Sequence, residues 1–254
     1  MKKTGIVLLV GMALALGSPA IANEIQVGYP TSPFGPYQSG VGGEFTLNDI
    51  NGTPNNNNSW LNLSGYVPGT TSNFGPSGIS SFQTFCIEVT EHISGYSQTY
   101  NAQLNTQAVF GSTATGGDPV SVGTGWLYSQ FARGALSGYN YTGNRTASAA
   151  LLQNAFWWLE NEGTTYTPTN PFMVAAFNHF GGEAGARADG GVNYGVFAVN
   201  LWTGNNPLQN RAQDQLYYDP GVGVTAVPDD GTTLALLGLA LAGVAIVARR
   251  FRTA

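Results

Sequence analysis

The sequence predicts an α+β fold, in which one β-rich domain carries a helical insert and has an apolar segment on either side of it in the chain. Three observations favour this fold class. Residues 23–110 have the pattern of strands, residues 125–180 that of helices, and residues 192–218 that of strands again. Strands, then helices, then further strands within about 200 residues are typical of a single α+β domain.

The strands of the first half are predicted by alternation. Apolar and polar residues alternate, or β-branched and aromatic residues gather, between turns rich in glycine, proline and asparagine. We expect residues 111–121 to form a loop that ends this half. The four most regular stretches are GEFTLNDI (43–50), WLNLSGYV (60–67), FQTFCIEVTEHI (82–93) and QTYNAQLNTQAVF (98–110).

After this loop, apolar residues recur every three or four positions, as they do in a helix. Leu152, Phe156 and Leu159, for example, are spaced as on one face of a helix. Two strands follow, and the first of them is apolar on both faces, which predicts a buried central strand. The expected helices are 125–136, 146–160 and 170–180, with breaks at Gly138, Gly163 and Gly181, and the expected strands are 192–203 and 212–218.

The charge of the chain excludes one class of partner. Only 9% of the residues are charged, against about 25% in an average globular chain. Residues 23–231 hold four arginines, no lysine and all 14 acidic residues, a net charge of −10. Binding to a phosphate backbone needs a basic surface. Nucleic acid is therefore not an expected partner.

Residues 1–22 have the features of a signal peptide. Lys2 and Lys3 precede a short apolar run, and the run is followed by the small-residue cleavage pattern Ala20-x-Ala22. Such a segment is removed on export. We expect signal peptidase to cut after Ala22, so that the chain from Asn23 onward is exported across the inner membrane.

The C-terminal segment has the composition of a short membrane-spanning helix. Leu234–Ala248 is an uncharged run of 15 residues. With the two threonines before it, the run reaches the lower limit of about 17 residues for a spanning helix. We therefore expect a transmembrane helix at 232–248, through which the chain contacts the membrane. Three arginines follow the run: Arg249, Arg250 and Arg252. Positively charged residues beside a spanning helix stay on the cytoplasmic side of the membrane. The chain upstream of the helix is therefore expected to lie outside the cytoplasm.

A short motif precedes this helix, formed by Val227, Pro228, Asp229 and Gly231. The motif, the apolar helix and the arginine cluster, in this order, resemble the PEP-CTERM class of exosortase sorting signals, in its Val-Pro-Asp-x-Gly variant. The resemblance covers residues 227–254. It implies processing by an exosortase-type enzyme in a Gram-negative bacterium, a transient membrane anchor, and delivery to the cell surface or the extracellular matrix. A plain tail anchor predicts the same topology, and in either case the working ectodomain is 23–226.

Cys86 is the only cysteine, so the chain forms no internal disulfide. A single cysteine is most often a small buried hydrophobe. If residues 82–93 form one unbulged strand, however, Cys86 lies on the face opposite Phe85 and Ile87. The predicted core face is that of Phe85, which leaves Cys86 as a candidate reactive thiol. We expect no metal site and no cofactor, because no second thiolate and no ligand spacing accompany it.

Gln153 is a polar residue in an almost wholly apolar helix, and such helices are buried. A buried carboxamide without a hydrogen bond costs on the order of 1–3 kcal/mol. Two interpretations follow. Either a neighbouring backbone group satisfies the amide, or the amide meets the thiol of Cys86. Trp157, four residues later, shares its helix face.

The sequences FCIE, around Cys86, and Gln153-Asn154-Ala155-Phe156-Trp157 are similar to the two signatures of bacterial surface thioester domains. The resemblance implies that Cys86 supplies the sulfur of a thioester and Gln153 the acyl group, with Trp157 shielding the bond. Glu88 is a neighbouring acid and a candidate proton relay, or else a solvated carboxylate. The implied ligand is an amine or hydroxyl group on another surface, attached by nucleophilic acyl transfer.

Other candidate chemistry is weaker. Glu160 and Glu162 are two residues apart on a helix and do not face each other, so we expect plain solvated acids rather than a glycosidase pair. His179 lies in FNHF, where we expect a packed core histidine. Three functions remain: a thioester adhesin, a non-covalent structural or carbohydrate-binding component of a biofilm matrix, whose partner is extracellular polysaccharide, and, last, a secreted hydrolase. We expect that the protein is not an enzyme.

Overall fold

The computed structural model describes residues 23–28, 35–40, 42–50, 60–66, 71–72, 81–95, 98–109, 117–205 and 210–222. The predicted signal peptide at 1–22 and the predicted sorting segment at 227–254 lie outside the described residues. Among the described residues, no helix has the length and apolar character that crossing a membrane requires.

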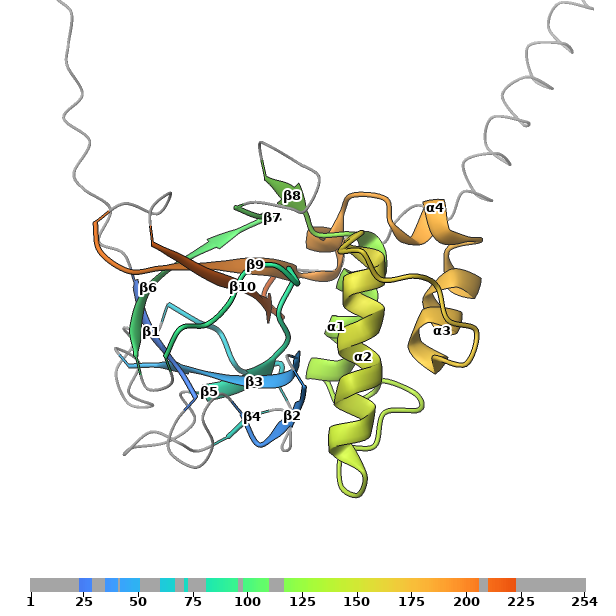
Figure 1. Ribbon diagram of the computed structural model, residues 1–254, viewed down its shortest axis with the longest axis horizontal. Helices are drawn as coiled ribbons and strands as arrows, with labels where there is room; N and C mark the ends of the chain where they lie inside the picture. The colour runs from blue at the N-terminus through green and yellow to red at the C-terminus, as the bar shows by residue number, and fades with distance from the viewer. Residues whose placement is uncertain are drawn as a thin grey trace, which may run out of the picture.

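The described residues form a mixed fold, in which a curled antiparallel sheet lies on one side and a group of helices on the other (Figure 1). The main sheet has the order β10-β9-β6-β1-β3-β5-β4, and β2 pairs with β3 beside this path. The strands of this sheet are β1 (Asn23–Val27), β2 (Tyr37–Ser39), β3 (Gly42–Asp49), β4 (Thr71–Ser72), β5 (Ser81–Thr84), β6 (Thr99–Asn105), β9 (Val196–Trp202) and β10 (Arg211–Tyr218). A separate pair joins β7 (Gln107–Ala108) to β8 (Asp118–Pro119).

The sheet curls far enough for its edge strand β10 to meet the chain just after β5. Cys86 forms an isolated antiparallel bridge with Gln215 of β10. Two backbone hydrogen bonds flank this bridge: the Ile87 N–H donates to the Asp214 carbonyl at 3.0 Å, and the Leu216 N–H donates to the Phe85 carbonyl at 3.0 Å. This short stretch is called the seam, and Cys86 stands in its middle.

The helices follow the predicted pattern closely. They are α1 (Val122–Ala132), α2 (Arg145–Leu159), α3 (Pro171–His179), the single turn α4 (Glu183–Ala186) and the 3₁₀ turn η1 (Gly191–Tyr194). Ser121 caps α1 by accepting the Thr124 N–H at 3.1 Å. Asn170 caps α3 in the same way, with a proline at the first helical position, where a missing N–H costs nothing.

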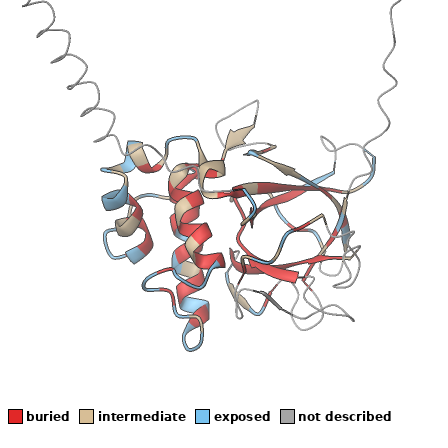
Figure 2. Cartoon of the chain, turned by 180° about the vertical axis from the view of Figure 1, so that it is seen from behind, coloured by how far each residue is buried: buried red, intermediate tan, exposed pale blue. Residues whose placement is uncertain are grey.

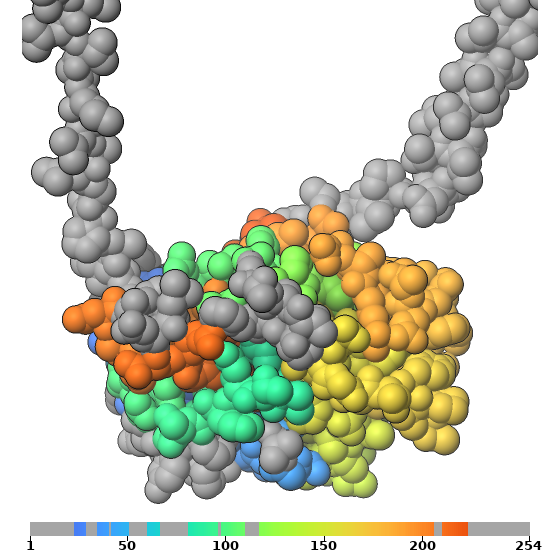
Figure 3. Space-filling model, turned by 45° about the horizontal axis from the view of Figure 1, so that its top comes forward, coloured from blue at the N-terminus to red at the C-terminus, as the bar shows by residue number. Residues whose placement is uncertain are grey.

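The interface between sheet and helices is aromatic. The ring of Phe85 meets Phe131 of α1 and Phe156 of α2 edge to face, with centroids 5.0 and 5.2 Å apart. Such arrangements are worth about 0.5–1.5 kcal/mol beyond the area that they bury. Figure 2 shows that buried residues gather where the helices meet the sheet. In the space-filling view, the helices lie directly against the strands (Figure 3).

Two of the predicted strands differ from the structure: one is absent among the described residues and the other is much shorter than expected. The described residues of 60–67 form no strand, and the stretch 82–93 holds only β5, which ends at Thr84. Pairing between β3 and β5 ends at the Phe45–Thr84 pair. Beyond it the chain leaves β3 and pairs with β10 at the seam, so a single register from 82 to 93 does not exist.

The predicted central strand is confirmed. β9 lies between β10 and β6 and is almost wholly buried. It begins at Val196 rather than at 192, because residues 191–194 form the 3₁₀ turn η1.

Candidate functional site

The structure brings Cys86 and Gln153 together, from the seam and from the middle of α2. The sulfur of Cys86 lies 3.2 Å from Oε1 of Gln153. The backbone N–H of Cys86 donates to the same oxygen at 3.3 Å, and Nε2 of Gln153 donates to the Cys86 carbonyl at 2.8 Å. The amide of Gln153 is thus held at both ends by one residue, with the thiol against it.

The expected face for Cys86 was wrong, although the expected contact is present. Phe85, Cys86 and Ile87 are all fully buried. At the seam both Phe85 and Cys86 contact helices, Phe85 through Phe131 and Phe156 and Cys86 through Gln153. No solvent-exposed face exists there, and the contact depends on α2 rather than on an open strand face.

Two further residues form the wall of the site. Trp157 is 7% exposed and stands one turn after Gln153 on α2. Gly42, the first residue of β3, leaves no room for a side chain: an added Cβ would lie 2.6 Å from Cγ of Gln153 and 2.8 Å from Cη2 of Trp157. The backbone of β3 therefore touches both side chains of α2.

The electrostatic setting keeps the resting thiol protonated. Burial raises the pKa of Cys86 well above its ordinary value, and the nearby carboxyl of Glu88 raises it further. The indole N–H of Trp157 opposes the rise in pKa. A thiol with a raised pKa is a weak nucleophile until it loses its proton, so attack on Gln153 requires proton transfer together with bond formation.

Glu88 is a buried acid and not a solvated one. It is 1% exposed, and its Oε2 accepts the Asp214 N–H at 3.2 Å. Burial raises its pKa strongly, and Asp214, Glu91 and Glu162 raise it further by repulsion. Its surroundings therefore favour the protonated form of Glu88, which can donate a proton.

Glu160 and Glu162, which were expected to be solvated, are 4% and 3% exposed. Glu160 accepts hydrogen bonds from the N–H and hydroxyl of Ser121, at 3.2 and 2.8 Å. Glu162 accepts the Val89 N–H at 3.0 Å. Both acids serve as fixed hydrogen-bond acceptors at the end of α2.

His179 is also different from the expectation. It is exposed rather than packed in the core, and its ring stacks on Trp126 with centroids 4.3 Å apart. Among the residues that the structure describes, no group of three or more metal-ligating side chains is placed to hold a metal ion.

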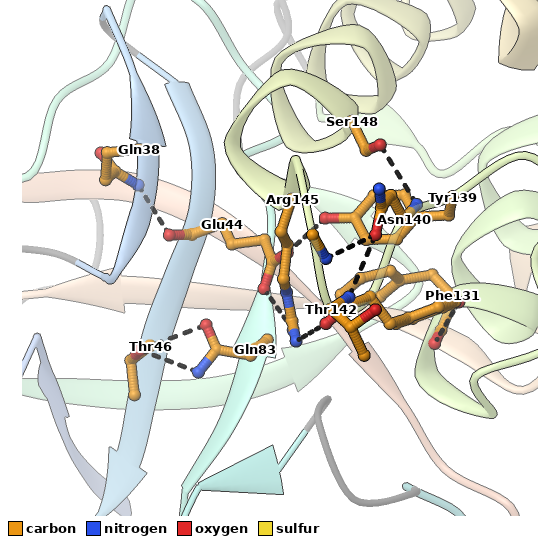
Figure 4. A network of polar contacts seen from close by, with 12 residues as sticks. Gln38, Glu44, Thr46, Gln83, Phe131, Tyr139, Asn140, Thr142, Arg145 and Ser148 are labelled. Carbon is orange, nitrogen blue, oxygen red and sulfur yellow. Dashed lines mark hydrogen bonds and ion pairs between the residues drawn. The ribbon is translucent and has the colours of Figure 1, made fainter.

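One conspicuous feature escaped the sequence analysis. Arg145, the first residue of α2, makes a two-pronged ion pair with Glu44 of β3, with both N···O distances 2.7 Å (Figure 4). Tyr139 donates its hydroxyl to the same carboxylate, and the guanidinium lies 4.4 Å from the ring centroid of Tyr37. A signal was present, since Arg145 is one of four arginines in 23–231 and opens an apolar helix.

The comparisons with known proteins concern the C-terminal segment. Residues 226–251 match the family model of the VPDSG-CTERM motif. The comparisons with curated proteins and with solved structures found no match. The matched segment contains the predicted sorting residues Val227, Pro228, Asp229 and Gly231, and it does not reach Cys86 or Gln153. It suggests an exported, surface-associated protein that is sorted by an exosortase-type system.

Proposed function

We propose that the exported ectodomain is a surface adhesin, in which Cys86 and Gln153 form an internal thioester that attaches a partner covalently. The observation that carries the proposal is the 3.2 Å contact between the thiol and the carboxamide of two residues far apart in the sequence. The oxygen in this contact is bonded to the carbon that the sulfur attacks, and a nucleophile held beside its target group reacts as if at very high concentration.

The chemistry needs no co-reactant. The sulfur of Cys86 attacks the carboxamide carbon of Gln153, a C–S bond forms, the C–N bond breaks, and ammonia leaves with the proton of the thiol. The Cys86 N–H already donates to Oε1, where negative charge develops during the attack, so it stabilises that charge. An amine or hydroxyl group of the partner later displaces the sulfur, and its proton passes to Cys86.

The surroundings support a bond that survives in water. Cys86 is fully buried and Gln153 is 1% exposed, and exclusion of water protects a reactive acyl group. Trp157 and Gly42 close the site on the side of α2 and β3. Residues 23–231 contain no lysine, so a thioester on one copy meets no lysine amine on the next.

Intact mass spectrometry of the mature protein tests the proposal. The thioester form has lost the mass of one ammonia, and methylamine adds to Gln153 in place of that ammonia. The variant Cys86→Ala has the full mass and takes up no methylamine. A parent protein with the full mass and no uptake of methylamine would overturn the thioester.

One observation favours a second candidate. The amide of Gln153 is bonded at both ends to the backbone of Cys86, which is also what a purely structural pin requires. On that alternative the protein is a non-covalent structural or carbohydrate-binding component of an extracellular matrix, and it is not an enzyme. The mass measurement separates the two, because the alternative predicts the full mass.

A further inference from the structure

Two buried oxygen atoms beside Cys86 have no hydrogen-bond partner among the described residues. They are Oε1 of Glu88 and Oε1 of Gln215. Glu88 is 1% exposed and Gln215 is fully buried. A buried polar atom without a partner costs about 1–3 kcal/mol, so two of them next to one reactive pair require an explanation.

The seam places Gln215 beside the thiol. Gln215 is the antiparallel partner of Cys86, and directly opposite residues of an antiparallel pair carry their side chains on the same face, about 4.5–5.5 Å apart. The amide nitrogen of Gln215 donates to the Gln213 carbonyl at 3.3 Å. This bond fixes the carboxamide of Gln215, whose other polar atom, Oε1, has no hydrogen-bond partner among the described residues.

Glu88 stands two residues after Cys86, beyond a bend in the chain at Ile87. Its Oε2 is bound to the Asp214 N–H, which leaves Oε1 unused. Nε2 of Gln213 donates to the Glu88 carbonyl at 2.7 Å. Glu88 therefore lies against the same segment of β10 that Cys86 meets at the seam.

Nε2 of Gln153, the nitrogen that leaves as ammonia, needs hydrogen-bond acceptors for its N–H groups. Nε2 of Gln153 donates one N–H to the Cys86 carbonyl at 2.8 Å. When the C–N bond breaks and the thiol proton moves to this nitrogen, the departing ammonia has three N–H groups to satisfy. An incoming primary amine has the same need in the reverse direction.

We infer that Gln215 is a catalytic residue of the site, whose Oε1 accepts an N–H of the nitrogen that leaves or enters at Gln153. This inference rests on the proposed thioester. With the Cys86 carbonyl, this oxygen supplies acceptors for two of the three N–H groups of ammonia. The site is thereby matched to nitrogen nucleophiles, which bring more than one hydrogen.

The test is the rate of methylamine incorporation in Gln215→Met, which keeps the length of the side chain and removes the acceptor. We expect the rate to fall about tenfold, the effect of one lost hydrogen bond. Gln215→Glu keeps an oxygen at this position and should retain most of the parent rate. The matched control is Gln83→Met on β5, another buried glutamine, whose side chain bonds to Thr46 instead; its rate should equal that of the parent.

Thermal unfolding of each variant separates a structural role from the proposed one. A merely structural Gln215 lowers the Tm without changing the rate in the folded protein, and an unchanged rate in Gln215→Met would overturn the inference. If Gln215→Met does not fold, Gln215→Glu decides, since a loss of rate there contradicts it. A parent protein with the full mass and no methylamine uptake defeats the proposed function, and this inference with it.

Discussion

Arg145 and Glu44 form an ion pair that solvent scarcely reaches: the two side chains are 4% and 0% exposed. The pair joins the first residue of α2 to β3, 101 residues earlier in the chain. Burial raises the pKa of Glu44, and the guanidinium of Arg145 opposes the rise. The pair holds α2 against the strand that also contains Gly42, so it fixes the wall of the Cys86–Gln153 site.

Removal of one member of this pair should be far more damaging than removal of both. Arg145→Met leaves an uncompensated buried carboxyl group, and we expect a loss of about 3–5 kcal/mol in the free energy of unfolding. The double variant Glu44→Leu/Arg145→Met should be more stable than Arg145→Met alone. Denaturant unfolding measures both. Arg187→Met, which breaks a partly exposed pair with Glu183, is the control and should cost at most about 1 kcal/mol. Equal stability of single and double variants contradicts this account.

Gly42→Ala should disable the site. The added methyl group would lie 2.6 Å from Cγ of Gln153, so the glutamine or the strand must move, at a cost of about 1–3 kcal/mol. We expect loss of methylamine incorporation and a lower Tm. Gly40→Ala is the control for a loss of stability without a clash, because Gly40 has a left-handed φ of +62° that strains an alanine but no neighbours within 4 Å. Equal incorporation in the two variants would show that Gln153 does not depend on this contact.

Acid should stabilise the protein. Burial raises the pKa of Glu160 to about 7 and that of Asp118 to about 6, and the pKa of Asp214 is raised as well. A carboxyl group whose folded pKa lies above its unfolded value contributes stability that is complete below the unfolded pKa, near 4.5, and is lost as the pH rises through the folded value. The Tm should therefore fall between pH 5 and pH 8.

Glu160→Gln tests the source of this pH dependence. The amide oxygen still accepts the two hydrogen bonds from Ser121 and carries no charge, so the variant should be more stable than the parent at pH 8, by on the order of 1–3 kcal/mol, and its Tm should change less with pH. Glu183→Gln, at an exposed carboxylate, should behave like the parent. A Glu160→Gln curve parallel to that of the parent would assign the effect to other groups.

A lysine on the surface should test the proposed thioester without a small-molecule probe. Ser137 lies in an exposed turn, where substitutions usually change stability by less than about 0.5 kcal/mol. Purified Ser137→Lys should slowly form oligomers that survive denaturant and reductant, because its amine attacks the thioester of another copy. Ser137→Arg has the same charge without a reactive amine and should stay monomeric. Oligomers that persist in the Cys86→Ala background would exclude the thioester as their cause.

The motif match at 226–251 predicts a processing step. Replacement of Pro228 and Asp229 by alanine should leave a longer, membrane-retained form, visible by immunoblotting of cell fractions. Asp230→Ala changes the variable position of the same motif and should be processed like the parent. If all three proteins have the same size and fraction, the segment is a plain anchor.

Sequence patterns that act over short range determined much of this protein. The spacing of apolar residues predicted α2 and its burial, and the glycine breaks predicted that the helices are separate. The terminal motif was readable because a sorting signal is a contiguous stretch of residues. The contact of Cys86 with Gln153 was also predicted, since a lone thiol and a polar residue in an apolar helix each pointed to an unseen partner.

Only the tertiary structure decided what surrounds that contact. Alternation along 82–93 predicted one exposed face, because a residue pattern reports the local period and not what covers each face. The curl of the sheet brings β10 against Cys86, buries Glu88 and puts Gln215 opposite the thiol. The Glu44–Arg145 pair likewise joins residues 101 positions apart. Acidic residues expected at the surface became buried acceptors because long-range closure of the sheet, which no local pattern encodes, determines their exposure.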